Sequence, residues 1–228
     1  MSIKAIVTDI EGTTTSIAFV HDVLFPYAKK HLADYVAKHY HNHVDLWQDI
    51  ATITQQDNLS QQQVIDILLE WIHQDKKITP LKTLQGFIWQ AGYQQGDLKG
   101  HIYLDAMQQL QKWHDAGIKL YIYSSGAVQA QKLLFGHTDY GDLTPWFSGY
   151  FDTHIGGKKE TSSYQKIAHQ IGQKAHHILF LSDMVDEITA ALQADYHVCH
   201  LDREQQHAPQ DSYPTVSNFT TIDDVIRF

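Results

Sequence analysis

The sequence contains one cysteine among its 228 residues and no apolar run long enough to cross a membrane. The lone thiol, Cys199, has no partner for an internal disulfide, and a reducing cytoplasm is therefore the expected setting. The first apolar run, Ile3 to Val7, is short and is soon followed by a charged residue, unlike a secretory signal. We expect a soluble, cytoplasmic protein without a membrane partner.

Positive charge is also scarce, with 17 Lys and Arg against 26 Asp and Glu and a formal net charge of -9. This balance argues against nucleic acid or an anionic membrane surface as a partner. A phosphorylated substrate would have to meet a local positive site, because the overall field does not attract it. The chain is rich in histidine, with 16 residues. We expect the close group His39, His41 and His43 to be solvated, because a spacing of two is poor for a shared metal on a helix.

Residues 16 to 100 lack a convincing strand and show helical periodicity, as at Val64, Ile65 and Leu68. Pro80 is expected to interrupt this pattern before a helix over 81–89. From residue 101 onward the pattern alternates between helices and strands. The expected strands are 118–123, 178–181 and 196–201, and one intervening helix is expected to have Thr161 as its N-cap.

Strands that alternate with helices predict a doubly wound α/β fold with a mostly parallel sheet. We expect residues 1–15 and 101–228 to form this core, and residues 16–100 to form a helical cap inserted after the first strand. Ligands of such sheets bind at the carboxyl ends of the strands. An insertion at that point is well placed to act as a lid.

The most informative segment is the first apolar strand, which runs into Asp9 and Glu11 and then a Gly-Thr turn. Alternate residues of an extended segment point to the same side, so both carboxylates can face one small volume. Two negative charges at such a short separation favour a nearby cation, and Mg2+ prefers oxygen ligands. The alternative is an ordinary strand end whose acidic residues are solvated.

Three later segments carry polar residues of complementary types. Ser124 and Ser125 stand between a predicted strand and a helix, where hydroxyl and backbone N-H groups suit phosphate. Lys158 and Lys159 follow a glycine turn, and Asp183 follows a buried apolar run. Each segment has an ordinary alternative when it is taken alone. The serines could simply cap a turn, the lysines could be a solvated surface pair, and the third segment could be the start of a helix. Their shared place at predicted strand or loop ends favours one common site.

The order Asp-x-Glu-Gly-Thr, Ser-Ser-Gly, Lys and Ser-Asp resembles the haloacid dehalogenase superfamily of phosphotransferases. The usual first signature of its phosphatases is Asp-x-Asp, whereas Glu11 occupies the second acidic position here. The run Asp-x-Glu-Gly-Thr-Thr is similar to that of the enolase-phosphatase family of methionine salvage (acireductone synthases). The resemblance includes the inserted segment, and it weakens after about residue 203. The stretches that carry it beyond the motifs are 19–28, 84–89, 123–126 and 131–136.

The resemblance implies an enzyme that enolises 2,3-diketo-5-methylthiopentyl-1-phosphate and then removes its phosphate. By similarity, Asp9 would be the nucleophile and Glu11 the general acid and base. Ser124 and Ser125 would hold the phosphate, and Lys158, rather than Lys159, would neutralise it. One Mg2+ per subunit would be held by Asp9, by the Glu11 backbone carbonyl and by Asp183. The family suggests a monomer.

Two alternatives remain open from the sequence. A phosphatase of the same superfamily could act on another small phosphorylated metabolite, such as a sugar phosphate. A phospho-acceptor signalling domain also uses Asp, Mg2+, Ser or Thr and Lys, but it would be shorter and lack the insertion. The residues do not identify the base for enolisation, for which Glu11 is our hypothesis.

Overall fold

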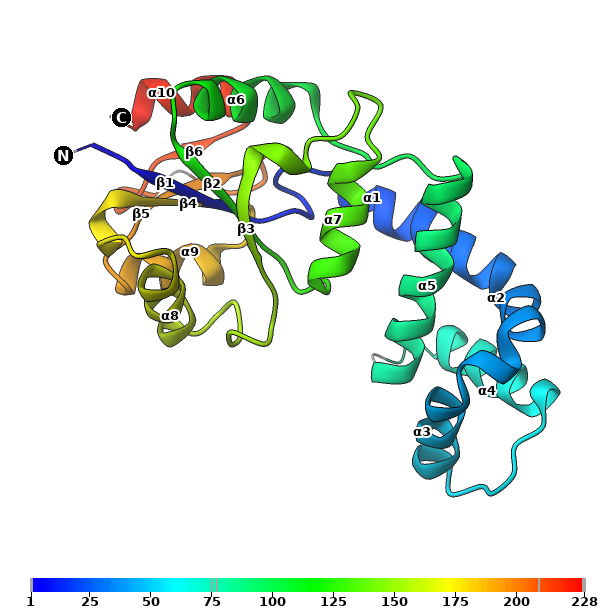
Figure 1. Cartoon of the computed structure of the whole chain (residues 1–228). Coiled ribbons are helices and arrows are strands. Elements are labelled where there is room, and N and C mark those ends of the chain that lie inside the picture. The colour runs from blue at the N-terminus through cyan, green and yellow to red at the C-terminus, as the bar shows by residue number, and fades with distance from the viewer. Residues whose placement is uncertain (1, 75, 77, 209, 227–228) are drawn as a thin grey trace. The chain divides into compact units, whose positions relative to one another are not determined.

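The computed structural model describes residues 2–74, 76, 78–208 and 210–226. Six strands and ten α-helices are assigned within these ranges, with short 3-10 or π segments between them (Figure 1). The strands are β1 Ala5–Thr8, β2 Lys119–Tyr123, β3 Phe147–Phe151, β4 Ile178–Ser182, β5 His197–Leu201 and β6 Thr215–Val216. The helices are α1 Ile17–Phe19, α2 Phe25–His39, α3 Val44–Thr54, α4 Gln61–His73, α5 Thr79–Gln95, α6 Leu104–Asp115, α7 Val128–Gly136, α8 Thr161–Ile171, α9 Val185–Gln193 and α10 Ile222–Val225.

The strands form one parallel sheet in the order β3-β2-β1-β4-β5-β6. Strand β1 lies between β2 and β4, with Ala5 opposite Lys119 on one side and Ile178 on the other. The chain winds from β1 through β2 to β3, and then continues from β4 on the other side of β1. The strand order therefore reverses between β1 and β4, which is where doubly wound folds bind ligands. The predicted α/β class is confirmed.

Helices cover both faces of this sheet. Helices α8 and α9 lie on one face, and α6 and α10 lie on the other (Figure 1). Strands β1 and β4 are buried along their whole length, which explains why their sequences are nearly continuous apolar runs. On the α8–α9 face, Val7 and Phe180 pack with Tyr164 and Ile188 in one buried cluster.

The chain divides into two compact units, Met1–Ile17 with Lys99–Phe228, and Ala18–Leu98. The sequence analysis placed the corresponding boundaries at residues 15 and 100. In the described part of the second unit the regular elements are helical, and Leu32, Leu68 and Leu84 belong to its own buried core. We treat this unit as the proposed cap. No described helix combines the length and apolar character that crossing a bilayer requires.

One local prediction was confirmed at a helix start and one was wrong. Pro80 stands where one helix gives way to the next, after α4 ends at His73, and it lies in the first turn of α5, where the missing N-H of proline has no intrahelical partner to lose. Thr161 is the first residue of α8, and Glu160 occupies the N-cap position instead. Gly172 ends α8 in the left-handed conformation, with φ of 69°, as a C-terminal glycine should.

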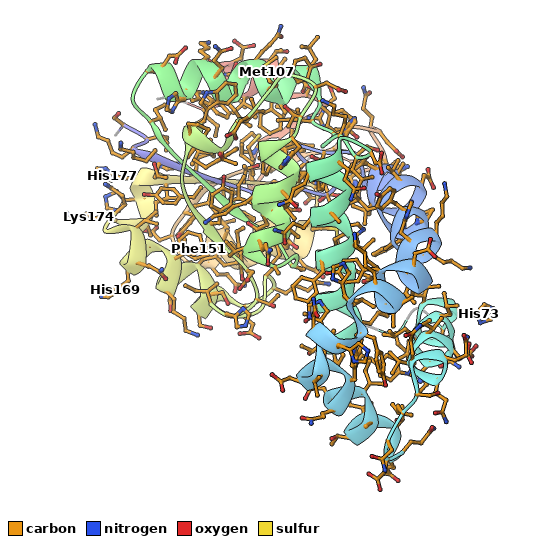
Figure 2. The ribbon with its side chains drawn as sticks, turned by 45° about the vertical axis from the view of Figure 1, so that its right-hand side comes forward. His73, Met107, Phe151, His169, Lys174 and His177 are labelled. Atoms are coloured by element: carbon orange, nitrogen blue, oxygen red, sulfur yellow. The ribbon has the colours of Figure 1, made fainter. Side chains whose placement is uncertain are left out.

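The histidines are only partly solvated. His73 on α4 and His169 on α8 project into solvent (Figure 2). His39 and His43, in contrast, are half-buried, and the His43 ring stacks on Phe87 with 4.8 Å between ring centroids. The expectation of solvated residues therefore holds for His41, which is exposed, but was wrong for His39 and His43, because aromatic side chains of the same unit cover them.

The buried face of β4 offers a test of the core. Phe180 is fully buried and its ring lies 5.0 Å from that of Tyr164. Phe180→Ala should lower the free energy of unfolding by about 3–5 kcal/mol through lost burial and the cavity left behind. The control Leu192→Ala, at a side chain 39% exposed, should cost less than about 1 kcal/mol. Chemical denaturation of both variants measures the difference, and equal losses would contradict the packing described here.

Candidate active site

The residues singled out from the sequence follow neighbouring parallel strands. Asp9 comes directly after β1, Asp183 after β4 and Ser124 after β2. Lys158 lies in the loop between β3 and α8. Because the carboxyl ends of parallel strands meet at one edge of the sheet, this topology brings the four side chains to the point where the strand order reverses.

The centre of the site is an ion pair between Asp9 and Lys158. The Lys158 Nζ lies 2.5 Å from Asp9 Oδ1 and 2.8 Å from Glu187 Oε2, and all three side chains are buried. Burial opposes the charged ammonium, but the carboxylates of Asp9 and Glu187 outweigh it and raise the pKa of Lys158. Lys158 is therefore a fixed positive charge next to Asp9.

The loop that carries Lys158 is fixed by two tyrosines of the core. The Tyr164 hydroxyl donates to the Lys158 carbonyl oxygen at 2.5 Å. The Tyr123 hydroxyl donates to the Gly156 carbonyl oxygen at 2.9 Å, and the Lys158 Nζ lies 5.8 Å from the centre of the Tyr123 ring. Lys159 points elsewhere and forms an exposed ion pair with Asp186 at 2.7 Å. Only the first of the two lysines therefore belongs to the site.

Glu11 lies beside Ser124 at the same edge. The Ser124 hydroxyl donates to Glu11 Oε2 at 3.1 Å, and its oxygen accepts from the Gly126 N-H at 3.1 Å. Burial, followed by the negative charge of Asp9, raises the pKa of Glu11. A raised pKa favours a protonated carboxyl, which can donate a proton to a leaving group. Ser125 is exposed, and among the described residues it forms no hydrogen bond to this group.

The turn after Glu11 packs directly against the turn after β4. Gly12 adopts a left-handed φ of 78°, and a Cβ there would overlap the Asp183 carboxylate. The glycine thus serves two needs, a positive φ and a close approach. The Asp183 N-H donates to the Thr13 hydroxyl at 3.0 Å, which joins the two turns.

The site carries more negative than positive charge. Burial, together with the charge of Asp9, raises the pKa of Asp183 to about 7. Its Oδ1 is buried and has no hydrogen-bond partner among the described residues. Lys158 is the buried cation beside four carboxylates, those of Asp9, Glu11, Asp183 and Glu187. An orphaned carboxylate oxygen in such surroundings suits a hard divalent cation.

The described residues contain no group of three His, Cys, Asp or Glu side chains arranged to hold a metal. The expected donor set has only two side-chain ligands: Asp9 and Asp183 would supply carboxylate oxygens, and the backbone carbonyl of Glu11 would supply the third. Such a set leaves the remaining positions for water and phosphate oxygens, as is usual for Mg2+.

Two residues of this region were missed by the sequence analysis. Glu187 was not singled out from the sequence, yet it is buried and accepts from both Lys158 and the Ser182 hydroxyl, each at 2.8 Å. His200 was given no role, yet it is buried and its Nε2 donates to the Asp183 carbonyl oxygen at 3.0 Å. Neither residue stands at a motif position that one sequence can single out.

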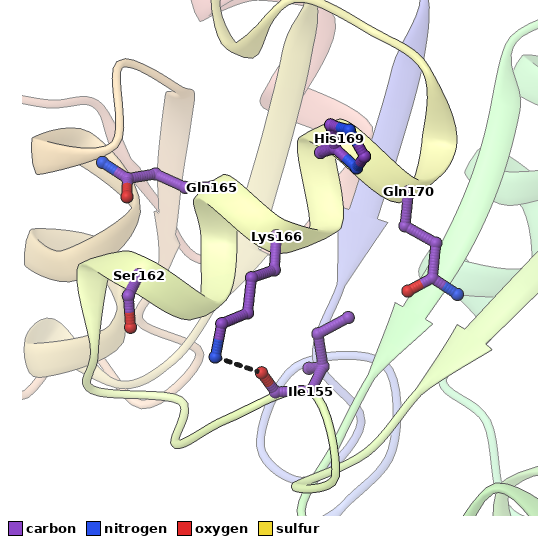
Figure 3. A pocket seen from close by; sticks show the side chains of 6 residues that line it. All are labelled: Ile155, Ser162, Gln165, Lys166, His169 and Gln170. Carbon is purple, nitrogen blue, oxygen red and sulfur yellow. Dashed lines mark hydrogen bonds between the residues drawn. The ribbon is translucent and has the colours of Figure 1, made fainter.

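A separate hollow of about 680 Å³ lies along α8. In it the Lys166 Nζ donates to the Ile155 carbonyl oxygen at 3.2 Å (Figure 3). It contains none of the residues predicted for the site. Its lining residues are Ile155, Ser162, Gln165, Lys166, His169 and Gln170.

Comparison with known proteins relates the chain to a family. The haloacid dehalogenase-like hydrolase model matches residues 3–195. The chain is 50% identical to enolase-phosphatase E1 of Pseudomonas fluorescens, with 98% of each chain covered. It is 49% identical to enolase-phosphatase E1 of Pseudomonas aeruginosa, with 97% of this chain and 99% of that one covered.

Solved structures agree with this relationship. The UTR4 protein of Saccharomyces cerevisiae is 34% identical, with a TM-score of 0.80 over 97% of this chain and all of that one. The HAD-hydrolase YfnB of Bacillus subtilis, at 12% identity and a TM-score of 0.64, shares the fold across the full length of both chains. The chain belongs to the enolase-phosphatase E1 family of haloacid dehalogenase-like hydrolases.

Proposed function

We propose that this protein is an enolase-phosphatase of methionine salvage. It converts 2,3-diketo-5-methylthiopentyl-1-phosphate to 1,2-dihydroxy-3-keto-5-methylthiopentene and phosphate. The observation that carries the proposal is the pairing of Asp9 with Lys158, beside a protonatable Glu11, in a chain about half identical to enolase-phosphatases along its length. Membership of a hydrolase family argues against a phospho-acceptor signalling domain.

In the phosphatase step, Asp9 is the nucleophile. One of its carboxylate oxygens attacks phosphorus, and the bond between phosphorus and the substrate oxygen breaks. Glu11 donates a proton to that leaving oxygen, consistent with its raised pKa. Glu11 then takes a proton from the water that hydrolyses phospho-Asp9, which releases phosphate and restores the carboxylate.

Phosphate binding falls to Lys158 and the two serines. The buried ammonium of Lys158 stabilises the negative charge of the transferring group at a fixed position. The Ser124 hydroxyl, now bonded to Glu11, would turn to a phosphate oxygen when substrate arrives. Ser125 is exposed and offers a second hydroxyl and a backbone N-H from the same turn.

The donor set described above fits one Mg2+, held by Asp9, Asp183 and the Glu11 backbone carbonyl. When bound, the ion supplies positive charge that offsets the excess of carboxylates and polarises phosphate and diketone oxygens. We further propose that the enzyme works as a cytoplasmic monomer and that Ala18–Leu98 acts as its cap. The insertion point of that unit, soon after β1 and the Asp9 that follows it, supports the last of these.

For the enolisation step we propose Glu11 as the base. It would remove a proton from C1 of the substrate, next to a carbonyl group. The electron pair of the broken C-H bond would form the C1=C2 double bond, and the resulting enolate oxygen would take a proton from water to give the enol phosphate. Glu11 is the position at which this chain departs from the usual Asp-x-Asp signature, and its longer side chain reaches further than aspartate. The proton it gains would be available for the leaving oxygen of the next step.

The overall activity is tested with the diketone phosphate and Mg2+, following phosphate release and the absorbance of the enediol product. Asp9→Asn should reduce phosphate release by about a thousandfold or more, since the nucleophile is lost. EDTA should abolish turnover, and added Mg2+ should restore it. Faster release from a panel of sugar phosphates than from the diketone would contradict the proposed substrate.

The role of Glu11 is tested with Glu11→Gln and Glu11→Asp. Both variants should fail to form the enol phosphate, the first because it has no base and the second because its carboxylate is shorter. Glu204→Gln, at an exposed carboxylate, serves as the charge control and should behave as wild type. Accumulation of enol phosphate at the normal rate in either Glu11 variant would assign the base to another residue.

Glu187 offers a test with a matched control. Glu187→Gln removes one of the two anions that hold Lys158 and should lower kcat by about tenfold or more, with a smaller change in KM. Asp186→Asn removes the adjacent exposed partner of Lys159, whose two side chains are each 63% exposed, and should leave kcat unchanged. Equal kcat values for the two variants would remove Glu187 from the site.

A further inference from the structure

Arg203 joins the C-terminal part of the chain to the turn after β1. It stands two residues beyond β5, and its Nε donates to the Thr13 carbonyl oxygen at 2.9 Å. Its Nη1 donates to both carboxylate oxygens of Asp105, at 3.1 and 3.3 Å. The guanidinium carbon lies 3.8 Å from the centre of the Tyr103 ring. Arg203 is therefore fixed by two hydrogen-bonded groups and one aromatic face.

Thr13 connects Arg203 to the turn after β1, which contains Glu11, and to the turn after β4, which contains Asp183. The residue is fully buried, and its hydroxyl accepts from the Asp183 N-H at 3.0 Å. Its carbonyl, bonded to Arg203, lies two residues after Glu11. A rotation of the Thr13 peptide would therefore move the Glu11 carbonyl and the Asp183 turn together. Arg203 opposes that rotation through its bond to the Thr13 carbonyl oxygen.

The neighbouring residue Thr14 is fixed by Tyr103, whose ring contacts Arg203. The Tyr103 N-H donates to the Thr14 carbonyl oxygen at 2.9 Å, and the Thr14 hydroxyl donates to the Asp9 carbonyl oxygen at 3.2 Å. Tyr103 thus contacts the turn through its backbone and Arg203 through its ring. The two contacts together fix the path of the chain between Glu11 and the end of the turn.

Asp105 anchors Arg203 in turn. Its Oδ2 accepts from the Phe219 N-H at 2.8 Å as well as from Arg203, so its carboxylate is fixed by two elements. The Arg203 and Asp105 side chains are only 14% and 21% exposed. A planar guanidinium can serve the carbonyl, the carboxylate and the ring at once, which a lysine ammonium cannot.

We propose that Arg203 is a positioning residue for the phosphatase reaction. It holds the Thr13 peptide and thereby fixes the position of the turn with Asp9 and Glu11 relative to the turn with Asp183. Because those three residues supply the proposed Mg2+ ligands, Arg203 sets the affinity for the ion without touching it. This inference rests on the proposed function of the same site.

The experiment compares Arg203→Met and Arg203→Lys with the control Lys112→Met. Lys112 forms an ion pair with Asp223 in the same unit, and its side chain is 66% exposed. Mg2+ alone is titrated into each purified protein by calorimetry, and kcat and KM are measured with an aryl phosphate. Thermal unfolding is recorded so that all measurements are made well below the melting temperature.

Arg203→Met should weaken Mg2+ binding by about 10- to 100-fold and lower kcat by a similar factor, with little change in KM. Arg203→Lys should recover part of both losses, because the ammonium can satisfy one of the two acceptors. A Mg2+ dissociation constant and kcat within about twofold of Lys112→Met in a folded Arg203→Met protein would overturn the proposal.

If Arg203→Met does not fold, Arg203→Lys decides the matter. Weaker Mg2+ binding than in wild type would support the positioning role, and an unchanged dissociation constant would overturn it. Neither readout uses the diketone substrate. Absence of diketone turnover by the wild-type enzyme would therefore contradict the proposed function alone.

Discussion

The buried ammonium of Lys158 is the interaction on which the site depends. It lies among carboxylates that repel one another, and it contacts two of them, Asp9 and Glu187. A buried charge is tolerated only where partners and hydrogen bonds replace water. Here the Tyr164 hydroxyl donates to the carbonyl oxygen of Lys158 in its loop, and the Ser182 hydroxyl donates to the Glu187 carboxylate. The same contacts that make the charge tolerable also fix its position next to Asp9. Stability and preorganisation therefore come from one set of bonds.

The topology of the sheet explains how distant residues come into contact. Asp9 and Lys158 are 149 positions apart, and Thr13 and Asp183 are 170 apart. Each pair meets because β1 is central and parallel to its neighbours, so that every strand delivers its following turn to the same edge. The reversal of strand order between β1 and β4 leaves space there that no crossover connection fills. Insertion of a helical unit just after β1 leaves this edge intact, since the strands themselves are uninterrupted.

Much of the core could be predicted from the sequence, because β1 and β4 are buried apolar runs and β2 and β5 are mostly buried, and polar turns follow β1, β2 and β4. Strand β3 was missed, since it lies at the sheet edge and contains Gly149, so its pattern is weak. The motif residues were visible because their types and order are specific. Glu187, His200 and Arg203 were not, because each acts on a backbone group or on another side chain, and such a contact is defined only by the fold. The sequence also could not show that Ser125 is exposed while Ser124 is buried, because the two adjacent residues are identical.

The acidic character of the site has a cost that the rest of the unit must offset. The pKa of Asp183 rises from its ordinary value of 3.8 to about 7, through burial and the charge of Asp9. A carboxyl with a raised pKa in the folded state favours folding when protonated, so its contribution is lost as the pH rises from about 4 to 7. At neutral pH the carboxylates of the site therefore repel one another, and a bound divalent cation would offset that repulsion by favouring the ionised form of Asp183. The Asp183 N-H donates to Thr13, His200 donates to the Asp183 carbonyl oxygen, and Arg203 donates to the Thr13 carbonyl oxygen. These hydrogen bonds hold the carboxylates together against this repulsion. Backbone groups are suited to this task, because a bond to the main chain of Asp183 or Thr13 fixes the turn and leaves the carboxylate oxygens free for the ion and the substrate.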